Sequence, residues 1–500
     1  MIRTKNNLMS SKIFILSLFG IVSVLGYSCN KSKVPDDVLD KLSQKIKLIE
    51  APFSKNNFEF LDSLITDKNI IQLGESIHIT HEFPTVRNEI VKYLNSKQDF
   101  DILALEGSAI DTWIGMDYLL GYSDSLDLHK VQEFAWFGLW QTQEMQEIIR
   151  TVNDSKQTSS DLYLAAFDIQ PNSGRLYSNQ SIFDTLFQKL SFYKEYDDDI
   201  TLNKWKRDFS YLIQCQGFKN DSLRNIGALK KIKKSIIEFD SLWVKELYPF
   251  VSELTTEIHG KATKLLPDNL MDRYCHCSEV TRKGIIDWRR YQIVRDSLNA
   301  QNVIMIGDSL SKNNKVITWA HHSHIHYNSN RKNIPSMGQY LKEQEGQNIY
   351  SIGCFAGEGK ALIANDDWLF PILAINIKPD TDIENILSQV DKGNFFLNTK
   401  DLTVESELTS YFSGGLSSRM ENNGKLNNNL PQDFDGIIFC SAISPPDLLL
   451  LPKMAKNIPF ILGWLYENWL LLIFISMLFI VFVVYRKRIN KNNIPKILKT

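Results

Sequence analysis

The chain has 500 residues, of which 43% are hydrophobic and 23% charged, and 56 basic against 58 acidic residues give a net charge of −2. This length exceeds what one hydrophobic core usually supports, so we expect one large domain with an insertion, or two domains. The balanced charge, without a basic stripe interleaved with aromatic residues, gives no reason to expect nucleic-acid binding. The sequence also contains neither a G-x-x-x-x-G-K-[ST] loop nor a G-x-G-x-x-G fingerprint.

The amino terminus has the layout of a secretory signal. Basic residues precede an apolar stretch from Ile13 to Leu25, and Ser28-Cys29-Asn30 follows it. A Cys directly after a small residue resembles a bacterial lipoprotein signal with Cys29 as the lipidated residue, although Gly26 stands where such signals usually have Leu. We predict a signal or lipoprotein-type segment over 1–29 and a linker over 30–52, with an uncleaved signal anchor as the alternative.

The carboxyl terminus predicts a membrane span. Residues 469–485 are almost all Leu, Ile, Phe and Val, with aromatic residues at the first border and Arg486-Lys487-Arg488 after the second. Length, aromatic border and positive flank predict a transmembrane helix region over 460–485 and a basic cytoplasmic tail over 486–500. The body would then be anchored to a bacterial cell membrane on its outer, extracytoplasmic side.

Short apolar runs that end in polar side chains are the main signal for the fold. In chain order they are Asn69–Glu75, Asp101–Glu106, Leu162–Asp168, Lys315–His321, Asn348–Gly353 and Phe434–Phe439. Such runs are typical of buried strands in a parallel sheet. Between the first two, apolar positions at helical spacing predict a helix, and a right-handed crossover of this length makes the strands parallel. The predicted fold class is α/β: a mainly parallel sheet flanked by helices.

The predicted body covers residues 53–453 and carries a helical insertion. Residues 178–265 are rich in Lys, Glu, Asp and Leu at helical spacing, which predicts an insertion or lid. Residues 413–429 are full of Gly, Ser and Asn and predict a mobile loop. If Cys29 is lipidated, the other five cysteines leave an odd number, so we expect mostly unpaired thiols.

Acidic, basic and imidazole side chains are expected to meet at one edge of this sheet. In open α/β sheets, ligands bind outside the carboxyl ends of the strands, where several of the runs place such groups. The candidate site residues are Glu75, His78, Arg87, Glu106, His321 and His324. Several groups of this kind on different strands favour an active site, whereas we expect His322 and His326 to be structural.

These residue types point to hydrolysis by an activated water. An imidazole has the intrinsic pKa of a general base near neutral pH, and a carboxylate beside it orients the ring. Water activated by His78 could attack an ester carbonyl, with His321, His324 or Arg87 stabilising the oxyanion. This chemistry requires no nucleophilic serine or cysteine, and the sequence has no G-x-S-x-G elbow.

Two alternatives stay open beside a site without metal or cofactor. The segment His78-x-x-His81-Glu82 is neither H-E-x-x-H nor H-x-x-E-H, yet with His321 and His324 a metal-dependent hydrolase is chemically possible. The body could also be a membrane-tethered binding module that keeps the cleft without turnover.

Several motifs occur together in an order that resembles the erythromycin esterase-like proteins. They are Leu73-Gly-Glu-Ser-Ile-His78, Ala104-Leu-Glu106, Tyr291-Gln-Ile-Val-Arg-Asp296 and Trp319-Ala-His-His-Ser-His324. The resemblance runs from about Phe53 to Pro446. It differs from the family pattern at Ile79, where Gly is usual, and at His322, where Asn is usual.

The resemblance implies an α/β fold with a helical subdomain and a small-molecule ester or lactone as substrate. It implies hydrolysis of a macrolide lactone, a route to antibiotic resistance, with the residue matching His78 as general base. The positions matching Glu75, Glu106, Arg87, His321 and His324 are implied to line the same cleft. No oligomeric state follows from the sequence.

Overall fold

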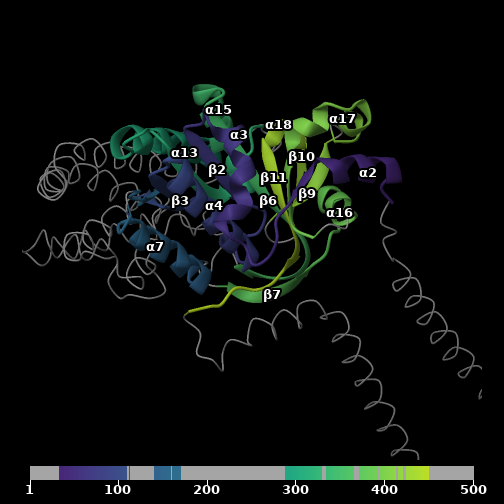
Figure 1. The fold of residues 1–500 in the computed structure, drawn as a ribbon, viewed down its shortest axis with the longest axis horizontal. Helices are drawn as coiled ribbons and strands as arrows, with labels where there is room; N and C mark the ends of the chain where they lie inside the picture. Colours follow the sequence, from purple (N-terminus) through teal and green to yellow (C-terminus); the bar gives the residue numbers. More distant parts are fainter. Residues whose placement is uncertain are drawn as a thin grey trace, which may run out of the picture.

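The structure is a computed structural model that describes residues 33–109, 112, 140–158, 160–169, 288–328, 334–364, 371–390, 393–412, 415–420 and 424–449. These residues form a nine-stranded sheet in the order β1-β8-β11-β6-β2-β5-β3-β4, with β7 paired to β6, and a separate two-stranded sheet of β9 and β10 (Figure 1). The strands are β1 (Ile46–Leu48), β2 (Ile70–Glu75), β3 (Ile102–Ser108), β4 (Tyr163–Asp168), β5 (Val316–His321), β6 (Ile349–Ala364), β7 (Pro371–Ile377), β8 (Phe395–Asn398), β9 (Leu416–Met420), β10 (Gly424–Asn428) and β11 (Gly436–Ile443).

Helices lie between the strands along the chain. The α-helices are α2 (Asp36–Lys45), α3 (Asp62–Ile65), α4 (Glu82–Gln98), α7 (Gln143–Ser155), α13 (Trp288–Leu310), α14 (His322–Ile325), α15 (Met337–Glu345), α16 (Asp382–Ser388), α17 (Ser406–Phe412) and α18 (Leu430–Asp433). Two 3₁₀ helices are η1 (Lys55–Leu61) and η7 (Thr399–Thr403).

The order of the strands explains why helices cover both faces of the sheet. From β2 the chain passes through α4 to β3 and through α7 to β4, in one direction along the sheet. It then returns through α13 to β5 and through α15 to β6, in the opposite direction. Because βαβ crossovers are right-handed, reversing the direction moves the helices to the other face. We call the two sides the α4 face and the α13 face.

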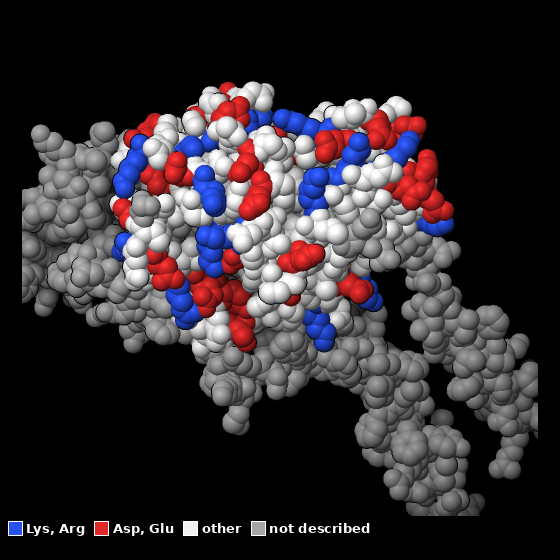
Figure 2. All heavy atoms as spheres, in the orientation of Figure 1, with Lys and Arg blue, Asp and Glu red and all other residues white. Residues whose placement is uncertain are grey.

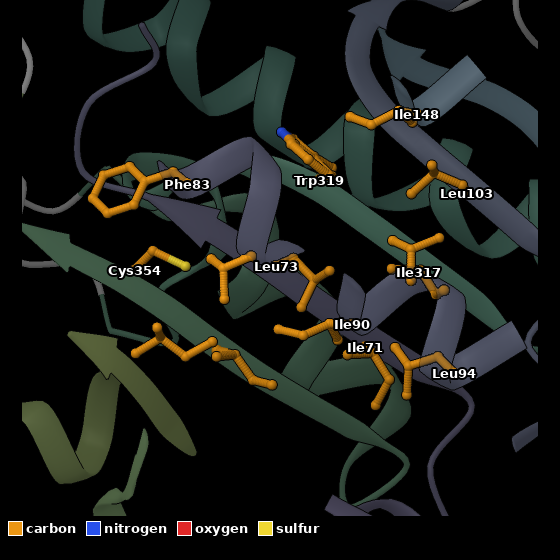
Figure 3. Close-up of a cluster of buried hydrophobic side chains, with 14 of the residues drawn as sticks. Ile71, Leu73, Phe83, Ile90, Leu94, Leu103, Ile148, Ile317, Trp319 and Cys354 are labelled. Atoms are coloured by element: carbon orange, nitrogen blue, oxygen red, sulfur yellow. The ribbon is translucent and has the colours of Figure 1, made fainter. Parts of the chain in front are cut away.

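Each face has its own apolar core. On the α4 face, Ile71 and Leu73 of β2 pack with Val86 and Ile90 of α4, and Figure 3 shows part of this cluster, including Trp319 and Cys354. On the α13 face, Ala300 and Val303 of α13 pack with Val316 and Ala320 of β5. Alternate residues of one strand therefore belong to different cores, as the two-residue period of a strand requires.

The six predicted strands are confirmed, and so is the helix between the first two. The pairs β2–β5, β2–β6, β3–β4, β3–β5 and β6–β11 are parallel, so the sheet is mainly parallel as predicted. The sequence did not indicate the antiparallel strands of the sheet. These are β1 and β8 at one edge and β7, which pairs with β6.

The predicted mobile loop at 413–429 is wrong, because β9 and β10 pair there as an antiparallel hairpin. Contacts with α16 hold the hairpin in place. The backbone N–H of Ser417 donates to Asp382, and that of Arg419 donates to Glu384 at 2.9 Å. Arg419 also forms an ion pair with Asp380. Tertiary contacts therefore override a composition that favours a loop.

Three other predicted segments lie outside the described residues. They are the amino-terminal signal, the insertion over 178–265 and the apolar run over 469–485. Within the described ranges, no helix combines the length and apolarity that a bilayer crossing needs. On the face that Figure 2 shows, acidic and basic side chains of the described ranges are intermingled.

Candidate active site

The carboxyl end of β2 carries a buried carboxylate that holds a partly exposed histidine. Glu75 is the last residue of β2 and is fully buried. The sharp turn after it brings His78 back, so that Nδ1 of His78 lies 2.7 Å from Oε1 of Glu75. The His78 side chain keeps 17% of its surface exposed. If Nδ1 carries the proton and donates it to Glu75, Nε2 is the basic nitrogen.

A buried arginine fixes this carboxylate from the other side. Nη2 of Arg87 donates to Oε2 of Glu75, and both side chains are inaccessible to solvent. The guanidinium lies 3.7 Å from the centre of the Trp319 ring, and its Nε donates to the carbonyl oxygen of Phe83. Burial lowers the pKa of Arg87 to about 9. Arg87 is thus part of the site and not a solvated residue of the helix surface.

His321 lies between the two faces of the sheet. It ends β5, next to Glu75 in the ladder, and its ring centre is 4.8 Å from that of His78. The Ser323 backbone N–H donates to Nδ1 of His321 at 3.2 Å, which caps α14. The proton is therefore on Nε2, which donates to the carbonyl oxygen of Ser76 at 3.1 Å.

Glu106 is on the α13 face, opposite Glu75. It alternates with Leu105 along β3, so its side chain points toward α13 and α14. Its Oε2 accepts the backbone N–H of His321 at 2.7 Å, and its Oε1 lies 3.1 Å from Nε2 of His324. Burial opposes ionisation, yet the charges on His324, His78 and Arg295 hold the pKa of Glu106 well below its usual range.

His324 lies between two carboxylates. Its Nδ1 is 2.5 Å from Asp296 of α13, and its Nε2 faces Glu106. Burial disfavours the charged ring, but Asp296 and Glu106 outweigh it and raise the pKa of His324 to about 9. Arg295 extends this network, because it donates to both oxygens of Asp168 at the end of β4 and to Glu106.

The six candidate residues therefore form two connected groups at one edge of the sheet. Glu75, His78 and Arg87 lie on the α4 face, whereas Glu106 and His324 lie on the α13 face. His321 joins them, through its ring on one side and its backbone N–H on the other.

Sequence reasoning did not select Asp296 and Arg295 as site residues. The signal that could have found them is the adjacent Arg-Asp pair inside a helical segment. Asp168 was noted as an acid that closes a strand, but it was not assigned to the site.

The residues of the alternative metal site point to different partners. His81 is half exposed, and its Nδ1 lies 2.6 Å from Glu144, whose hydrogen bond raises the pKa of His81. Glu82 accepts the backbone N–H and the hydroxyl of Ser444. Among the described residues, no group of three or more His, Cys, Asp or Glu side chains is arranged to hold a metal ion.

Three other buried side chains near these strand ends, those of His322, His326 and Cys354, have structural positions. His322 is buried against Phe355 and Phe434, and burial with the nearby charges of Arg87 and His326 lowers its pKa well below the usual value. His326 is buried as well. Cys354 lies inside β6, where burial raises the pKa of its thiol to about 12, so it is not a thiolate nucleophile at neutral pH.

Comparisons with known proteins agree with this architecture. A sequence model of the erythromycin esterase family matches residues 268–443, which include Asp296, His321 and His324. The Bacillus subtilis (strain 168) protein YbfO, named as a hydrolase, is 23% identical over 87% of this chain and 96% of its own length. The Escherichia coli protein named erythromycin esterase type I is 27% identical over 85 residues, which are 17% of this chain and 21% of its own.

The fold is also found among solved structures. A histidine-to-asparagine variant of the erythromycin esterase EreC, in its open conformation, superposes with a TM-score of 0.55. The two are 16% identical, and the match covers 82% of this chain and 98% of that one. The chain therefore resembles the erythromycin esterases in sequence over residues 268–443 and in fold, as the sequence motifs indicated.

Proposed function

We propose that this chain is a membrane-anchored hydrolase of carboxylic esters, with a small ester or macrolide lactone as substrate and His78 as the general base. The observation that carries the proposal is the Arg87–Glu75–His78 arrangement. A buried carboxylate, itself held by a buried guanidinium, orients the most exposed histidine of the cluster. The match of residues 268–443 to the erythromycin esterase family and the hydrolase name of YbfO support the reaction class.

In the proposed reaction, Nε2 of His78 takes a proton from water as the water oxygen attacks the ester carbonyl carbon. Glu75 stabilises the imidazolium that forms, in the way that the carboxylate of a Ser-His-Asp triad does. The tetrahedral intermediate collapses as the bond to the alcohol oxygen breaks, and His78 returns the proton to that oxygen. The products are a carboxylic acid and an alcohol, and the enzyme is regenerated.

The oxyanion of the intermediate needs a donor near His78. Both nitrogens of His324 face carboxylates, and Arg87 is buried beneath Trp319, which leaves His321 as the best placed candidate. We assign it the oxyanion, because its Nε2–H donates to the Ser76 carbonyl oxygen at 3.1 Å, a hydrogen bond that it can exchange for one to the substrate. Glu106 and His324 then support His321 from below.

The test is to incubate the full chain with macrolides and aryl esters, with and without a chelator, and to follow products by mass spectrometry. His78→Ala should abolish the gain of one water mass. His81→Ala is the matched control, since His81 is three residues away but bonded to Glu144, and it should keep turnover. Chelator-sensitive activity would favour the metal-dependent alternative. Turnover by His78→Ala would contradict the assignment of the base.

The proposed location is the outer side of a bacterial membrane, and it is supported by the apolar run at 469–485 and the basic residues after it. The full chain should sediment with membranes and be released by detergent but not by high salt. A variant that lacks both the amino-terminal segment over 1–29 and residues 460–500 should no longer sediment with membranes. Release of the full chain by salt alone would contradict a membrane span.

A further inference from the structure

An acidic residue outside the proposed catalytic group has an unusually specific position. Asp296 is 3% exposed and lies on α13, on the face of the sheet opposite His78. Its neighbour Arg295 reaches Asp168, whereas Asp296 points to His324. Successive residues of a helix point about 100° apart, so one Arg-Asp pair can serve two separate partners.

The two contacts of His324 require a particular protonation state. Asp296 faces Nδ1 at 2.5 Å and Glu106 faces Nε2 at 3.1 Å. A neutral imidazole has one N–H, so it can donate to one carboxylate and would turn a lone pair toward the other. An imidazolium ion donates to both. At 5% exposure of the His324 side chain, water offers little help, so the two carboxylates select the charged ring.

Glu106 connects His324 to the backbone of His321 at the end of β5. Its Oε1 accepts hydrogen bonds from His324 and Arg295, and its Oε2 accepts one from the backbone N–H of His321. The turn from β5 into α14 is therefore held at the residue whose ring lies 4.8 Å from His78. A loosened Glu106 would release the His321 backbone and alter the donor proposed for the oxyanion.

We propose that Asp296 is a positioning residue that holds His324 as an imidazolium cation, and through that cation fixes Glu106 beneath His321. Asp296 touches no reacting atom. The inference rests on the proposed function only for its activity readout, because the charge of His324 can be observed without substrate.

Other groups around His324 set the background for a titration. Asp296 and Arg295 come from α13 and Glu106 from β3, while His322 begins α14 and His326 directly follows it. Tyr340 of α15 faces Asp296 and stays neutral, since burial and that carboxylate raise its pKa. Neutralising Asp296 therefore leaves the His324 ring with one neighbouring carboxylate, that of Glu106, in place of two.

The first experiment is a histidine NMR titration of the full chain labelled at its histidine rings. The His324 signal is identified as the one missing in His324→Gln. In the wild type it should show both ring nitrogens protonated at pH 7.5 and no titration below pH 8. A neutral His324 at pH 7.5 in the wild type would overturn the proposal, whether or not any substrate has been found.

The second experiment compares Asp296→Asn with Asp308→Asn, an exposed acid on the same helix that serves as the matched control. Asp296→Asn should lower the His324 midpoint by more than one pH unit, and Asp308→Asn should not. In Asp296→Glu, the pH of the His324 titration midpoint should be close to that of the wild type. If Asp296→Asn fails to fold, the wild-type spectrum and Asp296→Glu still decide the matter.

The activity readout should show a fall in kcat with little change in KM, since Asp296 is buried away from substrate. For Asp296→Asn the fall should be about tenfold at pH 8 and smaller at pH 6, because acid restores the imidazolium. An equal loss at both pH values, with an unshifted His324 titration, would mean a merely structural role. If no ester is turned over by the wild type, the proposed function fails while the titration still tests Asp296.

Discussion

Replacement of Glu75 by Gln separates the structural role of the buried ion pair from its role in orienting His78. The change keeps the size of the side chain but removes its charge, so the Arg87 guanidinium, 1% exposed, is left without its carboxylate. A buried charge that loses its partner costs about 3–5 kcal/mol of folding free energy. The hydrogen bond to Nδ1 of His78 weakens as well, because an amide no longer stabilises the imidazolium.

The effect on turnover should be larger than the effect on stability suggests. Loss of the orienting carboxylate in a Ser-His-Asp triad lowers kcat by about 10⁴, so we expect a loss of roughly 10³–10⁴ in Glu75→Gln. Denaturant unfolding measures the loss of folding free energy, and initial rates on the best ester measure the loss of turnover.

The double variant Glu75→Gln/Arg87→Met removes both charges and keeps an apolar side chain over Trp319. Because the double variant leaves no unpaired charge buried, it should recover most of the lost stability. It should not recover turnover. Wild-type stability in Glu75→Gln, or wild-type activity in the double variant, would refute this reasoning.

Three further predictions concern the surroundings of the site. The pKa of His324 rises from 6.5 to about 9 on folding, so its stabilising effect is complete below pH 6.5 and lost as the pH rises through about 9. Over that window unfolding should become easier by roughly 3 kcal/mol, and the slope should flatten in His324→Gln. Cys354→Ala should keep turnover within about twofold, and iodoacetamide should not alkylate this thiol in the native chain at pH 8, since burial raises its pKa to about 12. Gly74→Ala should cost roughly 1–3 kcal/mol by thermal unfolding, because the new Cβ would lie 2.9 Å from His322 Cδ2 and against Ile325; an unchanged melting temperature would show that α14 moves freely.

The strands and their polar ends were predictable because burial on both faces leaves a simple signal. A run such as Ile70–Glu75 is apolar until its last residue, and parallel pairing then brings the last residues of several strands to one edge. The pairing of Glu75 with His78 follows from a spacing of three residues across a turn. Arg87 could be placed near the edge, but its burial under Trp319 could not be known from the helix alone.

The division of the site between two faces was not predictable from the sequence. It depends on whether Glu106 or Leu105 faces α13, and a shift of one residue in β3 would exchange them. The role of Asp296 depends on how α13 packs across the sheet, which involves residues 28 apart. The hairpin of β9 and β10 was not predicted for the same reason, because the residues that bind it lie on α16, about 35 residues earlier.

The most direct test of the central claim is a single-turnover reaction of the full chain in H₂¹⁸O with an ester that it hydrolyses. Direct attack by a water that His78 activates requires one ¹⁸O atom in the carboxylic acid product and none in the alcohol, no covalent acyl-enzyme by mass spectrometry, and loss of product in His78→Ala. An acylated enzyme would contradict direct attack by water, and undiminished product formation by His78→Ala would contradict His78 as its base.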